Sequence, residues 1–129
     1  MKKDIKARKD IELLVKTFYD RVKTDALIGP VFTEIARVNW EKHLPVMCDF
    51  WENALLYSGS YCGNPMHLHK HLHKVMPLQL EHFQQWNQLF ISTVDDLFSG
   101  EKALLAKQRT LKISAILQAD ILNTKKKDF

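Results

Sequence analysis

The chain contains few residues that break helices and no pattern typical of a β-sheet. Its 129 residues include only four glycines and four prolines. No stretch alternates apolar and polar residues between hairpin turns, and internal repeats and low-complexity segments are also missing. Because this length corresponds to one domain, we expect a single helical domain and not an array of modules.

Cysteines and long apolar runs are scarce as well. The two cysteines, Cys48 and Cys62, lie 14 positions apart and form no CxxC pair, which argues against a redox motif. No apolar segment approaches the length of a membrane span. Charged residues also interrupt the first ten positions, where a signal peptide would place its apolar core. These absences predict a reduced, soluble, cytoplasmic protein without membrane contact.

The body of the chain has little net charge. The formal charge of +4 comes from the two ends. Residues 1–9 hold five basic side chains against one acidic, residues 123–129 hold three against one, and residues 10–122 hold 11 against 13. We therefore expect a basic N-terminal extension at 1–9, a domain at 10–122 and a basic tail at 123–129. Both ends should be frayed and solvated, with no nucleic-acid partner.

Apolar residues recur every three or four positions through most of the chain, the spacing of an amphipathic helix. Asp10 is a plausible N-cap of the first helix, and Pro45 predicts a kink or a late start of the second. The expected segments run from Asp10 to Asp25, from Trp40 to Leu55 and from Pro77 to Phe98, and Ser99-Gly100 separates the third from a last helix that carries Ala106 to Ile121. With one short helix or turn before Pro77, the pattern predicts an all-α domain of four main helices.

Four of the six histidines fall within seven residues: His67, His69, His71 and His73. Imidazole is the commonest metal ligand among side chains. If the run were a strand, alternate histidines would share a face and could hold a metal such as zinc. If it were a short helix, one or two would point inward, and a single histidine could hold a haem iron. The spacing alone leaves both interpretations open.

Three polar side chains fall on apolar faces of three different expected helices: Tyr19, His43 and Trp86. A buried tyrosine hydroxyl, imidazole or indole N–H normally finds a hydrogen-bond partner. If these groups converge, they form a small polar cage that could bind an electron-rich ligand. If they do not, each lies at the edge of the core and tips toward solvent.

Several short motifs, taken in order, resemble the truncated haemoglobins, and more narrowly their third group, the two-over-two helical globins. The resemblance covers roughly residues 10–122, and the chain lacks the Gly-Gly pairs of the first two groups. The motifs are Phe18-Tyr19, Gly29-Pro30-Val31-Phe32, Trp40-x-x-His43, Phe50-Trp51, Tyr61-x-Gly63-x-Pro65-Met66-x-x-His69, Pro77-Leu78, His82-Phe83-x-x-Trp86 and Leu89-Phe90.

The resemblance implies a globin-like two-over-two helical sandwich that binds haem b. It implies that His69 is the proximal iron ligand and that Tyr19, His43 and Trp86 line the distal side. The residues expected to form the apolar haem pocket are Phe18, Phe32, Met47, Phe50, Phe83 and Phe90.

The resemblance also implies a function in binding dioxygen, nitric oxide or a related small ligand. A cage of several donors would slow dioxygen release, which suits chemistry on the ligand, such as nitric oxide dioxygenation or peroxide chemistry, better than transport. Such chemistry needs a reductase, and we expect a monomer. Two alternatives stay open at this point, a divalent-metal site built from the histidine run and a helical interaction module without a cofactor.

Overall fold

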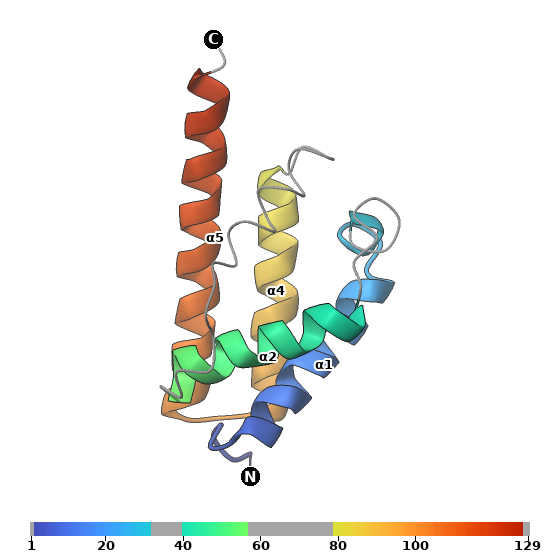
Figure 1. Cartoon of the computed structure of the whole chain (residues 1–129), viewed down its shortest axis with the longest axis vertical. Coiled ribbons are helices and arrows are strands. Elements are labelled where there is room, and N and C mark those ends of the chain that lie inside the picture. The colour runs from blue at the N-terminus through green and yellow to red at the C-terminus, as the bar shows by residue number, and fades with distance from the viewer. Residues whose placement is uncertain (1, 32–39, 57–78, 128–129) are drawn as a thin grey trace.

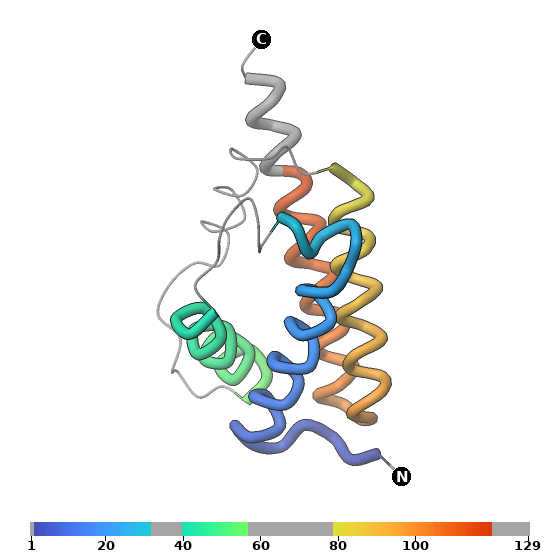
Figure 2. Tube along the Cα trace, turned by 90° about the vertical axis from the view of Figure 1, so that its right-hand side faces the viewer, coloured from blue at the N-terminus to red at the C-terminus, as the bar shows by residue number. Residues whose placement is uncertain are grey.

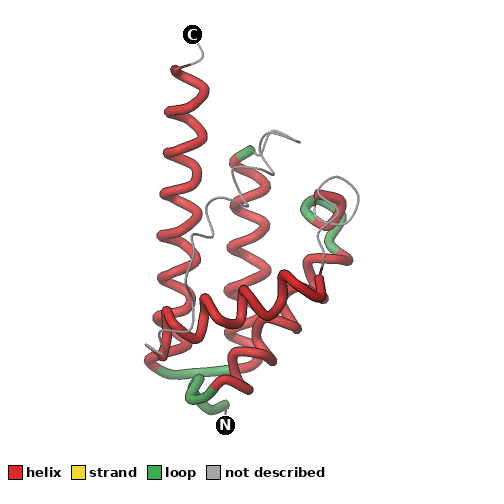
Figure 3. The backbone as a smooth tube through the Cα atoms, in the orientation of Figure 1, coloured by secondary structure: helices red, strands yellow, loops and turns green. Residues whose placement is uncertain are grey.

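The structure, a computed structural model, describes residues 2–31, 40–56 and 79–127, with side chains up to residue 119. It contains four long helices, namely α1 (Arg8–Thr24), α2 (Trp40–Leu56), α4 (Leu80–Leu97) and α5 (Glu101–Lys127). No strand occurs in the described part of the chain (Figure 3). The all-α prediction is therefore confirmed. The short helix or turn expected around the histidine run lies outside the described residues.

The helices pack as two pairs. Helices α4 and α5 run side by side in opposite directions, joined by a short connection, and α2 crosses over α1 at the lower part of the view in Figure 1. Turned by 90°, the molecule shows α1 lying between α2 and the α4–α5 pair (Figure 2). Helix α1 contacts both α2 and α4, and α2 also reaches α5. Helix α1 is therefore positioned to link the two pairs.

The apolar stripe of α1 forms the centre of the core, as its spacing predicts. The buried side chains in this stripe are Ile11, Leu14, Val15, Phe18 and Val22, none more than 2% exposed. Burying such a side chain stabilises the folded state by about 1.5–3 kcal/mol. Phe90 of α4 packs edge-on against Phe18 and stacks on Trp51 of α2, with ring centroids 5.2 and 4.7 Å apart. Aromatic side chains from three helices thus meet at one place.

The start of α1 differs from the prediction. Asp10 is not the N-cap, because the helix begins at Arg8, and Ala7, which occupies the cap position, has no side-chain acceptor. Instead the Asp10 carboxylate accepts hydrogen bonds from the backbone N–H groups of Lys6 and Ala7 at 3.0 and 3.2 Å. A carboxylate in the first turn can satisfy these unpaired donors from inside the helix. The predicted end of the helix near Asp25 is confirmed.

Helices α2 and α5 also differ in extent from the predictions. Helix α2 begins at Trp40 and continues through Pro45, so a late start after the proline is wrong. Helix α5 continues to Lys127 and therefore includes most of the segment expected as a tail. None of the helices in the described residues is long and apolar enough to cross a membrane.

The N-terminal residues pack against the rest of the domain, so the expectation that they fray is wrong. Ile5 is only 1% exposed, and the Ser99 N–H donates to the Lys3 carbonyl at 3.0 Å. The Asp4 carboxylate accepts hydrogen bonds from the N–H groups of Lys102 and Ala103, both at 2.9 Å. Asp4 thus caps the start of α5 from a point 98 residues earlier in the sequence.

Gly100 is the residue that allows this contact. Its φ angle is +138°, which side-chain-bearing residues rarely adopt, and a Cβ there would lie 2.6 Å from Cγ of Asp4. The glycine between α4 and α5 therefore provides both the backbone turn and the space for the capping carboxylate.

We expect Asp4→Ala to lower the free energy of unfolding by about 1–2 kcal/mol, because two helix N–H groups lose their acceptor. Urea denaturation checks this. Glu12→Ala is the matched control, since Glu12 makes only an exposed ion pair with Arg8 at 3.4 Å and should cost no more than about 0.5 kcal/mol. An equal effect of the two substitutions would contradict the capping role.

The same contribution should depend on pH. Burial by itself raises the pKa of Asp4, but the hydrogen bonds from Lys102, Ala103 and Ile5 outweigh it and hold the pKa below 3.8. The stabilisation is present above the pKa of the unfolded chain and is lost as pH falls. The difference in urea midpoint between wild type and Asp4→Ala should therefore narrow below about pH 4.

Candidate functional site

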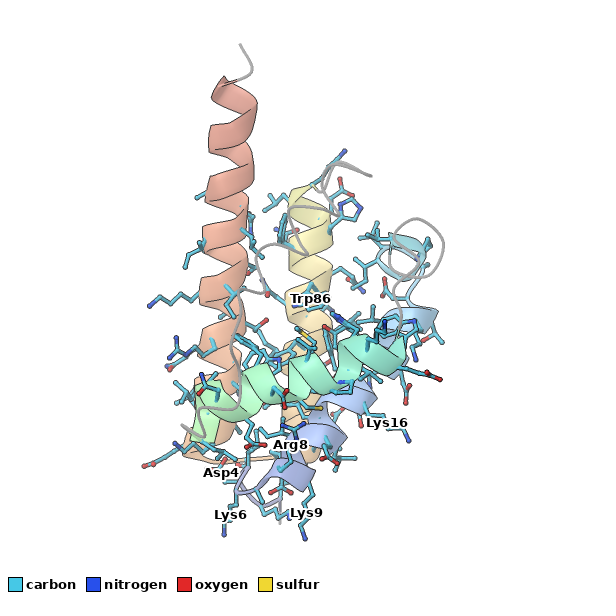
Figure 4. The ribbon with its side chains drawn as sticks, viewed as in Figure 1. Asp4, Lys6, Arg8, Lys9, Lys16 and Trp86 are labelled. Carbon is cyan, nitrogen blue, oxygen red and sulfur yellow. The ribbon has the colours of Figure 1, made fainter. Side chains whose placement is uncertain are left out.

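Tyr19, His43 and Trp86, which the sequence placed on three separate helices, come together in the structure. The ring centroid of Tyr19 on α1 lies 5.1 Å from that of His43 on α2 and 5.8 Å from that of Trp86 on α4. Both pairs are edge-to-face, the arrangement that aromatic rings prefer. Figure 4 shows Trp86 on α4 just above the level at which α2 crosses. We call Tyr19, His43 and Trp86 the polar cluster.

The adjacent residues Phe18 and Tyr19 connect this cluster to the core. Successive residues of a helix point about 100° apart, so the two rings have different partners. Phe18 packs edge-on against Trp86 and Phe90 of α4, with centroids 4.7 and 5.2 Å apart. Tyr19 is directed instead toward α2 and is only 3% exposed. Packing of Phe18 therefore fixes the rotation of α1 that presents Tyr19 to His43.

The electrostatic surroundings keep the cluster uncharged at neutral pH. Burial raises the pKa of Tyr19 far above its ordinary value, so its hydroxyl keeps its proton and remains a donor. Burial also lowers the pKa of His43, which favours the neutral imidazole. A neutral imidazole can donate from one nitrogen and accept at the other.

His43 carries the feature that most directly indicates a ligand. Its Nε2 atom is buried and has no hydrogen-bond partner among the described residues. Buried polar atoms are normally paired, and leaving one unpaired costs free energy. A polar ligand held between Tyr19, His43 and Trp86 would supply the missing partner. The donor set fits a small electron-rich ligand.

The predicted pocket-lining residues fall into two groups. Phe18, Met47, Phe50 and Phe90 all belong to the main core. Phe83 instead forms a separate apolar cluster with Leu117 and Ile113. Their contact with haem stays a prediction. Phe32, His69 and the neighbouring His67, His71 and His73 lie outside the described residues.

Trp40 and Lys23 are neighbours of the cluster that sequence analysis missed. The Trp40 ring lies 5.3 Å from the ring of Tyr19 and 5.8 Å from that of His43, and the Lys23 ammonium lies 4.6 Å from the Trp40 centroid. The helical spacing contained a signal for both, because Lys23 follows Tyr19 by four residues and Trp40 precedes His43 by three.

A metal site of the zinc type finds no support in the part of the chain that the structure describes. There, no three histidine, cysteine, aspartate or glutamate side chains gather closely enough to hold a metal ion. The histidine run itself is not among these residues, so the alternative based on it stays an untested prediction.

Comparison with known proteins shows which family the chain resembles. No family model matches the chain. The chain is 30% identical over 114 residues to the group 3 truncated hemoglobin ctb of Campylobacter jejuni, a match that covers 86% of this chain and 87% of that protein. Its structure is similar to the crystal structure of group III truncated hemoglobin from Campylobacter jejuni, with a TM-score of 0.79 and 27% identity. That similarity covers 94% of this chain and 95% of the other. The predicted globin-like helical sandwich is thereby confirmed.

We expect the His43 imidazole to titrate below pH 6.5, because burial disfavours its charged form. The shift also makes the stability of the fold depend on pH. A histidine whose pKa is lower in the folded chain than in the unfolded chain stabilises the fold above about pH 6.5, and this contribution is lost as pH falls. Proton NMR of the histidine ring signals checks this, with His43→Gln used to assign the resonance. A midpoint at or above 6.5 would contradict the buried, neutral state.

Proposed function

The chain belongs to the group 3 truncated haemoglobins, and we propose that it binds a small diatomic ligand such as dioxygen between Tyr19, His43 and Trp86. Haem binding follows from membership of the family. The observation that carries the proposal is the convergence of three polar rings from three helices, one of which, His43, has a buried Nε2 atom without a hydrogen-bond partner among the described residues.

We also propose that the cofactor is haem b and that His69 is its proximal ligand. Haem iron, when bound, supplies an open coordination position for a small ligand opposite the protein imidazole. His69 follows Pro65 by four residues, the place that the family pattern gives to this ligand. Its neutral imidazole would hold the iron.

The polar cluster would act on the ligand as a set of hydrogen-bond donors. The Tyr19 hydroxyl stays protonated at neutral pH, and the Trp86 indole N–H is a donor only. His43 donates or accepts according to its tautomer. Dioxygen gains negative charge when bound, so each donor should stabilise it by about 1 kcal/mol, and by more where water is excluded.

Strong retention of dioxygen suits conversion of the ligand better than transport. We propose nitric oxide dioxygenation as the reaction class, with peroxide chemistry as the second candidate. The buried donor set favours this proposal. It can hold an electron-rich ligand by hydrogen bonds alone, because it adds no charged side chain beside the iron. The reaction would require a reductase as partner.

We expect the purified protein to show a Soret band that sharpens and shifts when carbon monoxide is added to the dithionite-reduced form. His69→Ala should abolish or rearrange haem binding, because it removes the imidazole that holds the iron. His71→Ala and His73→Ala are matched controls from the same run and should retain the wild-type spectrum. Absorption spectra with and without carbon monoxide make the comparison.

Two other outcomes would contradict this proposal in different ways. A colourless chain that stays colourless after haemin is added would overturn haem binding itself. Equal loss of bound zinc from substitutions at His67, His69, His71 and His73 would instead support the divalent-metal alternative.

We expect Tyr19→Phe and Trp86→Phe each to accelerate dioxygen dissociation by roughly fivefold, the effect of losing one hydrogen bond of about 1 kcal/mol. Stopped-flow release of dioxygen checks this. Trp51→Phe makes the same chemical change on the Phe90 side of the core and should leave the rate near that of wild type. If neither Tyr19→Phe nor Trp86→Phe changes the rate, the polar cluster does not control ligand retention.

A further inference from the structure

The contacts of Lys23 and Trp40 extend the polar cluster toward the surface. On α1, Lys23 lies one helical turn after Tyr19, and on α2, Trp40 lies one turn before His43. The two faces meet, so that Tyr19 contacts both His43 and Trp40 while the Lys23 ammonium lies over the Trp40 ring at 4.6 Å. Four side chains thus form one continuous row between two helices.

Burial decreases along this row. Tyr19 is buried, His43 and Trp40 are half-buried, and Lys23 is exposed. The Trp40 ring contacts the rings of both Tyr19 and His43, with the latter pair at an interplanar angle of 77°. Trp40 is therefore the side chain that links the buried hydroxyl and imidazole to the cation at the surface.

Within the described part of the chain, ring packing and not a hydrogen bond orients the Nε2 end of His43. That atom has no hydrogen-bond partner among the described residues, so the positions of Tyr19 and Trp40 determine how firmly the imidazole is held. Of these two rings, Tyr19 is fixed by the core, whereas Trp40 is half-buried and depends more on what lies on its outer side.

Lys23 lies over the ring of Trp40 and can therefore hold that ring in place. Its ammonium lies within the distance at which a cation is attracted to an indole face. Lys23 also lies 3.9 Å from the Asp20 carboxylate, an exposed pair of the kind that contributes little. A lysine in the last turn also interacts favourably with the C-terminal end of α1.

We propose that Lys23 and Trp40 form a positioning pair that holds the His43 imidazole against Tyr19 and thereby slows the entry of a small ligand into the polar cluster. This inference rests on the proposed function for its consequence, since it concerns the ligand that the cluster binds. Lys23 does not touch the ligand and acts only through Trp40 and His43.

The experiment measures carbon monoxide association by flash photolysis on the haem-loaded full chain. Lys23→Met keeps most of the aliphatic side chain but removes the cation, and it should accelerate association by roughly two- to fivefold, the range expected for one exposed cation–π contact. Lys23→Arg keeps a cation that can lie on the indole and should restore the wild-type rate.

Two controls separate this effect from a general change in charge or stability. Lys16→Met removes a lysine from the same helix, whose side chain reaches away from the helices in Figure 4, and should leave the rate unchanged. In a His43→Leu background, Lys23→Met should no longer accelerate association, because the residue through which it acts is missing. Equal rates in Lys23→Met and Lys16→Met, or an undiminished effect without His43, would overturn the positioning pair.

A second readout does not depend on ligand binding. The ring-proton NMR signal of His43 should shift in Lys23→Met relative to wild type and stay in place in Lys16→Met; an unchanged signal in both would also overturn the pair. A chain that takes up no haem would contradict the proposed function. The His43 signals of the Lys23→Met and Lys16→Met chains would still show whether Lys23 positions the imidazole. The two failures are therefore distinguishable.

Discussion

The edge-on packing of Phe18 against Trp86 and Phe90 is the contact on which the rest of the structure depends. It joins α1 to α4, and so joins the two helix pairs. Because Phe18 is adjacent to Tyr19, the same contact fixes the direction in which the Tyr19 hydroxyl can point. The packing of Phe18 in the core therefore also brings the residues of the polar cluster together. Stability and ligand binding therefore share one constraint on the rotation of α1.

The rotation of α4 is fixed by a polar contact next to Trp86. Asn87 donates from Nδ2 to the Ser114 hydroxyl of α5 at 2.9 Å, and its Oδ1 accepts from Thr110 and Ser114 at 3.5 and 3.2 Å. Thr110 and Ser114 are both buried. A buried polar group tolerates little rotation, because losing its partner costs about 1–3 kcal/mol. With Asn87 held toward α5, the neighbouring Trp86 is directed toward α1, where Phe18 and Tyr19 receive it.

The sequence was sufficient for features set by local periodicity. The apolar stripe of α1 predicted the buried face that contains Phe18, and motif order predicted that Tyr19, His43 and Trp86 belong to one site. Features that depend on contacts distant in sequence were not visible. Nothing near Asp4 indicates that its carboxylate caps a helix 98 residues later, so the N-terminus was wrongly expected to fray. The prediction made Asp10 the N-cap, whereas it is the third residue of the helix. The two cases look alike in sequence, because a carboxylate can satisfy the first N–H groups from the cap or from inside the first turn.

Trp40 shows most clearly why composition and spacing fall short at the site. Read along the chain, its spacing places it one helical turn before His43 but gives no sign of its contacts with α1. Its role emerges only when α1 lies against α2 and brings Lys23 over its ring and Tyr19 to a centroid distance of 5.3 Å. A half-buried indole that contacts a cation and two aromatic rings is held more tightly than its exposure alone indicates. Lys23 then positions the imidazole through the indole, and the entry of a ligand can be tuned without a change in the groups that touch it.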